Sequence, residues 1–338
     1  MGNIIVTGGA GFLGSHLIDH LMSEGHQVYA LDDLSSGCEK NLSKWLKLPD
    51  DELKSMGDIF QYTPGKRPRL KLLDIDITNK YVDNPWLSDV GDVDCIFHLA
   101  GRMDVMSSFR EPYDDGMRNY IGTVNVLEFA RKMDCPRVIQ RSSFTVYSRD
   151  NPVVVNEEGE IGPISPYAHH KYMSERILDL YNEHYGMMNV SLRLFNMYGP
   201  RQDPSSIYSG VVTRFLDRAL RDKKLHVYGK GSQKRDFIHA KDAIKAIHLA
   251  NTQKASGVYN VGTGIGTSIT DLAMIIKELL GDELEIEKKP ERKGELKNCI
   301  ADISRIRGEL GFEPEIDLKS GIRNTLEWMR IEGERNYD

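Results

Sequence analysis

A tyrosine and a lysine four positions apart could form a general base. Ser165 and Pro166 are typical of a helix start, the serine as N-cap and the proline in the first turn. Tyr167 and Lys171 would then lie at positions i and i+4 on one helix face. A lysine ammonium beside a phenol favours the phenolate and lowers the tyrosine pKa from its usual value of about 10. The pair therefore predicts a tyrosine that can accept a proton near neutral pH.

A serine earlier in the chain could complete this set. Ser143 follows an apolar run that is expected to form a strand. The carboxyl ends of strands are where α/β sheets place their ligands. Ser143 could therefore donate a hydrogen bond to a substrate oxygen that Tyr167 deprotonates.

The glycine-rich run 7–14 predicts a turn that binds a dinucleotide. Glycines at positions 8, 9, 11 and 14 follow an apolar strand and precede a helical pattern. Such glycines permit a tight turn, a close backbone approach to the pyrophosphate and close packing of helix on strand. The pyrophosphate would lie at the helix N-terminus, where free N–H groups favour an anion.

An acidic residue at the end of the second expected strand indicates which dinucleotide binds. Asp32 is placed to accept hydrogen bonds from the adenosine ribose hydroxyls and to repel a 2′-phosphate. Its neighbours Asp33, Leu34 and Ser35 supply no arginine that would reverse this preference. We therefore predict NAD rather than NADP.

The expected elements alternate between strands and helices in the first half of the chain. This order predicts an α/β fold with a doubly wound parallel (Rossmann) sheet. Strands are expected at Asn3–Thr7, Gln27–Leu31, Leu70–Leu73, Asp94–Leu99, Arg137–Arg141 and Val190–Leu194. Helices are expected at Phe12–Glu24, which Gly25 would cap, and at Gly122–Lys132 and Pro166–Tyr185.

The pattern changes near residue 190 and predicts two domains. We expect an NAD-binding Rossmann domain over 1–190 with a return segment near 236–262. A smaller, mixed α/β nucleotide-sugar-binding domain is expected over 191–338. Its elements would be helices at Val211–Arg221 and Ile269–Leu280, a strand at Val258–Val261, a turn at Gly229–Gly231 and two late helices. Residues 45–69 interrupt the first domain as an insertion.

Composition excludes several classes of function. The net charge of −6 and the dispersed basic residues give no reason to expect nucleic acid as a partner. No run of about 18 apolar residues predicts a membrane span. The four cysteines lie far apart without metal-binding spacing, so we expect free thiols, no metal and a cytoplasmic protein.

Together these motifs resemble those of extended short-chain dehydrogenase/reductases, in the NAD-dependent sugar epimerase/dehydratase family. Within it, the chain is most similar to UDP-glucose and UDP-N-acetylglucosamine 4-epimerases. The resemblance covers nearly the whole chain apart from residues 45–69. It is carried by TGGAGFLGSHL at 7–17, LDDLSSG at 31–37, FHLAG at 97–101, SSFTVY at 142–147, SPYAHHK at 165–171, LRLFNMYGPRQDP at 192–204, YGKGSQKRDFIH at 228–239 and VYNVGTG at 258–264.

The resemblance implies roles for particular residues. Ser143, Tyr167 and Lys171 would be catalytic. Tyr167 and Lys171 would also contact NAD, Lys171 at the nicotinamide ribose. The other residues implied around NAD are Gly8, Gly11, Phe12, Leu13, Gly14, Asp32, Asp33, Ser36, Gly37, Asp76, Ile77, Leu99, Ala100, Gly101 and Asn119. The residues implied around a UDP-sugar substrate are Ser143, Asn196, Arg235, Arg292 and Cys299. A homodimer is also implied, with the helices around Tyr113–Lys132 and Pro166–Tyr185 pairing into a four-helix bundle.

Two residues after Ser143 distinguish the reactions of this family. Dehydratases of the family carry a T-D-E-V-Y pattern here, which supplies an acid and a base. Related decarboxylases tend to carry a glutamate at the position of Thr145. Here Phe144 cannot act as an acid, and Thr145 is a poor base at neutral pH. We therefore expect C4 epimerisation through a 4-keto intermediate. The alternatives are a UDP-uronate 4-epimerase, a decarboxylase, a 4,6-dehydratase or a non-catalytic NAD-binding regulator.

Two further residues bear on the choice of sugar. Cys299 matches a family position where a bulky side chain excludes 2-acetamido sugars, so this small residue predicts use of UDP-GlcNAc and UDP-GalNAc as well as UDP-Glc and UDP-Gal. A buried thiol without influence on the substrate is the alternative. Arg141 could select a carboxylated sugar such as UDP-glucuronate. We expect it to lie off the pocket, because strand side chains alternate between faces.

Overall fold

The chain forms two compact units. The computed structural model describes residues 2–46, 69–79, 90–204, 206, 209–290 and 298–335. The first unit comprises Met1–Val146, Pro163–Leu192 and Ile247–Val258. The second comprises Tyr147–Gly162, Arg193–Ala246 and Tyr259–Asp338. Compared with the predicted domains, residues 147–162 belong to the second unit, and the return to the first unit is shorter than 236–262.

The first unit is built on a seven-stranded sheet of the expected α/β class. Its strand order is β11-β7-β5-β4-β1-β2-β3, and neighbouring strands from β3 through β5 pair in parallel. The strands are β1 (Asn3–Thr7), β2 (Gln27–Asp32), β3 (Leu70–Asp74), β4 (Cys95–His98), β5 (Val138–Ser143), β7 (Val190–Leu194) and β11 (Gly257–Val261). The direction of strand addition reverses between β1 and β4. In open α/β sheets, ligands bind at the carboxyl ends of the two strands that flank such a point.

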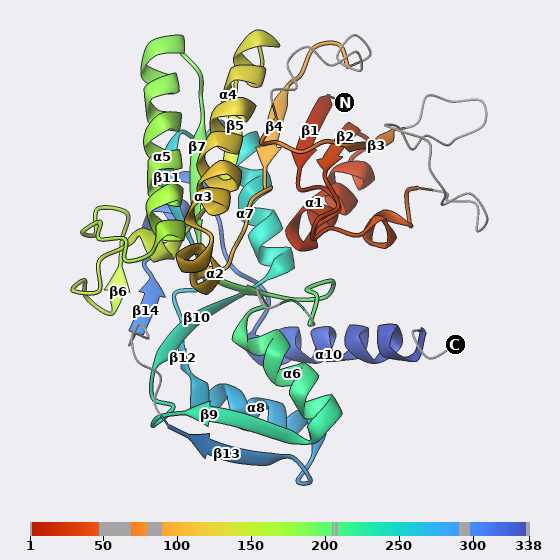
Figure 1. The fold of residues 1–338 in the computed structure, drawn as a ribbon, viewed down its shortest axis with the longest axis vertical. Helices are drawn as coiled ribbons and strands as arrows, with labels where there is room; N and C mark the ends of the chain where they lie inside the picture. Colours follow the sequence, from red (N-terminus) through yellow and green to blue (C-terminus); the bar gives the residue numbers. More distant parts are fainter. Residues whose placement is uncertain are drawn as a thin grey trace. The chain divides into compact units, whose positions relative to one another are not determined.

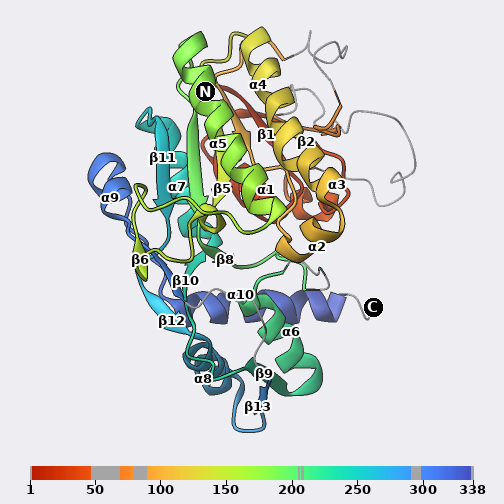
Figure 2. The ribbon, with the colours of Figure 1, turned by 60° about the vertical axis from the view of Figure 1, so that its left-hand side comes forward.

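Helices cover both faces of this sheet (Figures 1 and 2). They are α1 (Phe12–Ser23), α2 (Val105–Arg110), α3 (Pro112–Gly116), α4 (Gly122–Lys132), α5 (Pro166–Tyr185) and α7 (Ala240–Thr252). Leu31 and Ile96 point to the face where Phe129 of α4 and Leu178 of α5 complete a buried core. Ala30 points to the opposite face, against α1.

Short elements complete the first unit. A π-helical turn spans Met117–Ile121, and 3-10 turns span Glu39–Leu42 and Phe144–Val146. Of the predicted insertion, residues 47–68 lie outside the described part of the chain. At its start, Trp45 Nε1 donates a hydrogen bond of 2.6 Å to Asp19 of α1.

The second unit contains a mixed sheet and a two-stranded ribbon, as a mixed α/β arrangement predicts. The mixed sheet joins β12 (Gly266–Ser268), β10 (Lys234–His239), β14 (Asn298–Ala301) and β6 (Val154–Val155), and β8 (Asn196–Tyr198) also pairs with β10. The ribbon pairs β9 (Lys224–Tyr228) with β13 (Glu285–Lys289) in parallel. The helices are α6 (Val211–Asp222), α8 (Ile269–Leu280), α9 (Ser304–Leu310) and α10 (Leu318–Arg335).

A separate core holds the second unit together. Leu225 of β9, Leu216 of α6, Ile276 of α8 and Ile322 of α10 are fully buried against one another. Across the described parts of both units, no helix has the length and apolarity needed to span a membrane.

Candidate functional site

The turn after β1 is shaped so that only glycine fits at two of its positions. Gly8 has a φ of 68°, and a Cβ there would lie 2.8 Å from the backbone nitrogen of Ala100. A Cβ on Gly14 would lie 2.0 Å from the Gly8 carbonyl oxygen. Gly11 is the N-cap of α1 and no side chain caps the helix, so the N–H groups of Phe12 and Leu13 begin it without a capping acceptor. Backbone and helix end together form a cradle for a phosphate group.

Asp32 lies directly beside this turn. Its Oδ2 accepts a hydrogen bond of 2.8 Å from Ala10 N, and its Oδ1 accepts one of 3.0 Å from Leu34 N. Burial raises the pKa of Asp32 to about 6, against the opposing effect of these backbone bonds. A Cβ on Gly37 would lie 2.7 Å from Asp32 Oδ1, so this glycine allows the segment after β2, with exposed Ser36, to approach the carboxylate.

An arginine from elsewhere in the chain reaches the segment after β2. Arg118 Nη1 lies 3.0 Å from Asp33 Oδ2 and 3.5 Å from Ser35 Oγ. The prediction of NAD rested on the residues that follow Asp32 in the sequence, so it did not include this cation. Asp33 and Asp114 both pair with Arg118, so the single positive charge of Arg118 is more than offset by these two carboxylates.

The strands β3 and β4 end close to the same turn. Leu99 N donates to the Thr7 carbonyl and Ala100 N to Thr7 Oγ1, each over 3.2 Å. Gly101 has a φ of 128°, and a Cβ there would lie 2.6 Å from Asn119 Oδ1. The predicted residues 8–14 and 99–101 therefore lie together at the carboxyl ends of β1 and β4.

Asp76 and Ile77 follow β3, and hydrogen bonds and side-chain packing hold them in place. Asp76 Oδ1 accepts a 2.8 Å hydrogen bond from Thr78 N. The Ile77 carbonyl accepts a 2.9 Å hydrogen bond from Asn125 Nδ2, and the Ile77 side chain is buried against Gly122 of α4.

His98 at the end of β4 has a positioning role. Its Nδ1 lies 2.8 Å from Thr7 Oγ1 and its Nε2 lies 3.0 Å from Thr123 Oγ1. Burial, with the nearby Lys171 and Arg141 charges, lowers the pKa of His98 to about 3. The imidazole is therefore neutral at neutral pH and ties β1 to α4.

The predicted catalytic residues come from β5 and α5. Ser143 is the last residue of β5, and its Oγ accepts a 3.0 Å hydrogen bond from Thr145 Oγ1. The predicted start of α5 is confirmed, because Ser165 Oγ caps it by accepting from Ala168 N over 3.1 Å. Tyr167 and Lys171 are both buried on this helix.

A charge other than the expected one acts on Tyr167. Burial raises the pKa of Tyr167, whereas the Arg141 guanidinium and a hydrogen bond with Ser143 act in the opposite direction. Burial, reinforced by Arg141, lowers the pKa of Lys171 well below its usual value. The Arg141 guanidinium is therefore a positive charge that acts on the Tyr167 phenol, and the role of the Lys171 ammonium stays a prediction.

Arg141 leaves the same face of β5 as Ser143, so the alternation argument that placed Arg141 off the pocket does not hold. Arg141 precedes Ser143 by two positions on β5, so the two side chains leave the same face of the strand. Arg141 is buried, and its Nη2 donates to the Gly101 carbonyl over 3.1 Å. Lys171 Nζ donates in turn to the Arg141 carbonyl over 3.3 Å.

A π-helical turn presents Asn119 beside these groups. Because this turn shifts the helical hydrogen bonds, the Asn119 carbonyl accepts from Ser174 Oγ over 2.7 Å and Thr123 Oγ1 over 3.0 Å. Asn119 Nδ2 donates to the buried Asp115 over 3.0 Å, while Asn119 Oδ1 is buried without a hydrogen-bond partner. Asp115 also bonds His170 over 2.6 Å. Sequence reasoning identified Asn119 but missed Asp115, Ser174 and His170.

Three predicted substrate residues share one sheet face in the second unit. Arg235 of β10 is in register with Cys299 of β14, and Phe237 of β10 is in register with Asn196 of β8. Residues two apart on a strand and register partners on neighbouring strands point the same way. Asn196, Arg235 and Cys299 therefore leave the same face. Arg292, the fourth, lies outside the described residues.

Cys299 is a neutral thiol on this face. Burial raises its pKa to about 12, against the opposing effect of the Arg235 charge. Cys299 is therefore a small side chain on this face, and its protonated thiol lacks the reactivity of a thiolate. The four cysteines are all free, and only Cys38 is exposed.

Comparison with known proteins gives the family. Residues 4–262 match the model of the NAD dependent epimerase/dehydratase family. The chain belongs to this family. A UDP-glucose 4-epimerase of Mycolicibacterium smegmatis is 34% identical over 329 residues, which cover 96% of this chain and 98% of the relative.

Solved structures of epimerases have the same fold. A UDP-glucose 4-epimerase of Thermotoga maritima, solved with UDP-glucose, matches with a TM-score of 0.85 and 34% identity over 98% of this chain and 99% of that one. A UDP-N-acetylglucosamine 4-epimerase of Methanobrevibacter ruminantium, solved with UDP-N-acetylmuramic acid, matches with a TM-score of 0.85 and 32% identity over the same shares.

The family cofactor NAD fits the residues of the first unit. The glycine turn and uncapped α1 suit its pyrophosphate, and the Asp32 carboxylate suits its adenosine ribose. The unpartnered Asn119 Oδ1 lies beside Gly101, where a further hydrogen-bond donor can bind. The residues of the first unit are therefore suited to the cofactor of this family.

Proposed function

We propose that this enzyme inverts C4 of UDP-hexoses with NAD, through a 4-keto sugar. One observation carries the proposal: Tyr167 is buried, hydrogen-bonded to Ser143 and near the Arg141 charge, at the edge of the sheet that holds the dinucleotide turn. Neither Phe144 nor Thr145, the residues after Ser143, can supply the acid or the base that an elimination of water needs.

The side chains divide the proton chemistry between them. Tyr167 accepts the C4 hydroxyl proton, and Ser143 holds that oxygen by a hydrogen bond. The positive charge of Arg141 stabilises the phenolate before this transfer. When bound, NAD supplies the reversible oxidation at C4. Tyr167 then returns the proton to the oxygen of the re-formed alcohol, so no external reductant is consumed.

The second unit holds the nucleotide in this proposal. Arg235 supplies a planar, permanently charged donor set that suits a diphosphate, and Asn196 adds an amide donor on the same sheet face. Arg292 is proposed as a further phosphate contact. A firm hold on UDP and a loose hold on the sugar allow the 4-keto sugar to present its opposite face.

Cys299 sets the permitted size at C2 of the sugar. Its side chain is small and lies beside Arg235 in the register of β10 and β14. We propose that it leaves space for an acetamido group, so that UDP-GlcNAc and UDP-GalNAc are substrates alongside UDP-Glc and UDP-Gal.

The enzyme is proposed to work as a homodimer. Met173 and Leu180 lie seven residues apart on α5 and are 42% and 41% exposed, although both are apolar. Phe109 of α2 and Tyr113 of α3 are exposed by 57% and 80%. Helices α2 and α3 both pack against α5. We define these four residues as the α5 face and propose that a second copy covers it.

A second candidate substrate is a UDP-uronate. The buried Arg141 guanidinium beside Tyr167 favours it, because a permanent positive charge can attract a carboxylated sugar. The similarity to UDP-glucose 4-epimerases makes the neutral hexose the first candidate.

A substrate panel separates these candidates. The purified enzyme is incubated with UDP-Glc, UDP-GlcNAc, UDP-glucuronate and other nucleotide-diphosphate sugars, and NMR reads inverted C4, lost CO2 or lost water. Bound NAD is measured after denaturation. Inverted C4 on the first two sugars supports the proposal. Lost CO2, lost water or turnover of UDP-glucuronate alone contradicts it.

A further inference from the structure

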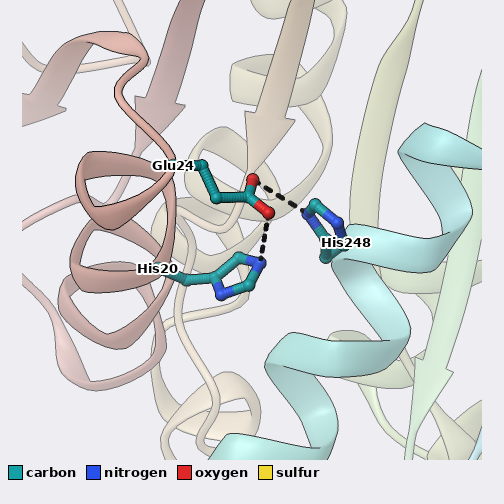
Figure 3. A group of neighbouring side chains, drawn as sticks. All are labelled: His20, Glu24 and His248. Carbon is teal, nitrogen blue, oxygen red and sulfur yellow. Dashed lines mark ion pairs between the residues drawn. The ribbon is translucent and has the colours of Figure 1, made fainter.

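Three imidazoles surround one carboxylate at the end of α1, away from the residues described above. His20 Nε2 lies 3.6 Å from Glu24 Oε1, and His248 Nδ1 of α7 lies 3.6 Å from Glu24 Oε2. His26 Nε2 lies 3.5 Å from the same Oε2. Figure 3 shows the first three side chains turned toward one another from two helices. All four residues belong to the first unit.

We propose that His20, Glu24 and His248 bind a divalent transition-metal ion of the zinc class. Two imidazole nitrogens and one carboxylate oxygen form a donor set that zinc takes in proteins, with water as the fourth ligand. The three donor atoms all lie within 4.8 Å of one another. The cluster is histidine-rich, and hard cations such as Mg²⁺ prefer oxygen donors, so the donor types select the softer class.

The separations fit a metal ion better than direct hydrogen bonds. Zinc bonds of about 2.0–2.1 Å at tetrahedral angles place neighbouring donor atoms about 3.3–3.4 Å apart. The two separations of 3.6 Å, one to each Glu24 oxygen, are close to this value and beyond a good hydrogen bond. The three donor atoms lie within 4.8 Å of one another, so an inward movement of the side chains would bring them to the spacing of zinc ligands.

One buried ring nitrogen in the cluster makes no hydrogen bond. His20 Nε2 is buried as an atom and makes no hydrogen bond, although the rest of its ring is partly exposed. The His20 and His248 rings meet edge to face with centroids 4.5 Å apart, which fixes their mutual orientation. A cation between them and Glu24 would satisfy this nitrogen.

His26 orients the carboxylate and is not a ligand in this proposal. Its Nδ1 accepts a 3.3 Å hydrogen bond from the Gly2 N–H, so the proton of the neutral ring lies on Nε2. His26 Nε2 faces Glu24 Oε2 at 3.5 Å. A polar neighbour of this kind, outside the ligand set, helps to hold a ligating carboxylate in position for the metal.

The proposed ion would join α1 to α7. Helix α1 begins at the dinucleotide turn and has 12 residues, about 18 Å of length, so its far end is distant from that turn. We therefore expect the ion to stabilise the first unit against unfolding and to leave turnover unchanged.

Zinc titration of the full chain tests this site. The protein, free of affinity tag and stripped with a chelator, is titrated with Zn²⁺ by calorimetry, and its Tm is measured with and without Zn²⁺. The variants are His20→Gln and His248→Gln. The matched controls are His184→Gln, an exposed histidine of α5, and Cys38→Ser, which removes the exposed thiol. Retained NAD binding shows that each variant is folded.

The proposal predicts one Zn²⁺ per chain in the wild type and in both controls, with a rise in Tm. Either ligand variant should lose at least about tenfold in affinity and most of the Tm rise. A wild type that binds no stoichiometric Zn²⁺ would show that the cluster is a set of ion pairs only. Unchanged affinity in both ligand variants would equally overturn the proposal.

Discussion

Arg141 Nη2 donates a hydrogen bond of 3.1 Å to the carbonyl oxygen of Gly101. This bond joins the end of β5 to the segment after β4, and it holds a permanent positive charge near the phenol of Tyr167. Burial lowers the pKa of Lys171 well below its usual value and also lowers the pKa of Arg141, but a guanidinium starts from a much higher value and keeps its charge in proteins. Arg141 is therefore the dependable source of the charge that favours the phenolate.

Replacing Arg141 should change the pH dependence of turnover. Arg141 lowers the pKa of Tyr167, so Arg141→Gln raises it and moves the acidic limb of the kcat/KM profile to higher pH. At neutral pH we expect activity to fall about tenfold. Arg141→Lys is the matched variant, since it keeps a positive charge and should shift the limb less. An unmoved limb in Arg141→Gln would rule out this role.

Binding of NAD should weaken as pH falls through about 6, because burial raises the Asp32 pKa to about 6. Below this pH the carboxyl group of the free protein is protonated and loses acceptor capacity toward the ribose hydroxyls; above it the group is ionised. Calorimetric titration with NAD on both sides of this pH measures the effect. Asp32→Asn should bind NAD more weakly and lose this pH dependence. The same pH dependence in the variant would assign it to another group.

Cys299→Tyr should narrow the range of sugars. A phenol ring on the face shared with Arg235 fills the space proposed for the acetamido group. We expect kcat/KM for UDP-GlcNAc to fall by about 100-fold, with UDP-Glc turnover changed only a few-fold. Cys299→Ser keeps the small size and should retain both activities. Equal loss on both substrates in Cys299→Tyr would indicate misfolding or a different gate.

Leu180→Asp should convert the proposed dimer to a monomer. Leu180 is 41% exposed on the α5 face, and a carboxylate there would be buried without a partner in the proposed dimer. Light scattering after gel filtration gives the mass. Ile265→Asp is the control, because Ile265 is 68% exposed in the second unit and away from this face. A wild type that is already monomeric at micromolar concentration would contradict the dimer.

Local sequence patterns were sufficient to predict many of the helices and strands of the first unit. The apolar run before the glycines predicted β1, and the spacing in Gly122–Lys132 and Pro166–Tyr185 predicted α4 and α5 to the residue. Strong periodicity and clear end signals, such as Ser165 and Pro166, explain this agreement. Tyr167 and Lys171 lie on α5, one of these well-marked elements, whereas Ser143 lies on β5, two residues beyond the predicted strand end at Arg141.

Other features depend on contacts that the local pattern does not contain. Arg118 reaches Asp33 across 85 positions of the chain, so a search of the neighbours of Asp32 could not find it. The short strands β8, β12 and β14 have little apolar periodicity and form through pairing with β10 or β6.

The flaw in the alternation argument for Arg141 had a simpler origin. The alternation of strand side chains was used to place Arg141 relative to the pocket as a whole. The two positions that separate Arg141 from Ser143 were not counted. Two positions on a strand return a side chain to the same face, so the pattern itself could have placed Arg141 with Ser143.

The central claim is that Tyr167 of this enzyme moves the C4 proton of a UDP-sugar while bound NAD is regenerated. It is tested most directly by an NMR time course of UDP-galactose and UDP-GalNAc with wild-type enzyme and Tyr167→Phe, without added reductant. The account predicts conversion to the C4 epimers by the wild type, and a rate lower by about 10²–10⁴ in Tyr167→Phe with NAD binding retained. Equal rates in the two proteins, or a wild type that forms no C4 epimer, would contradict it.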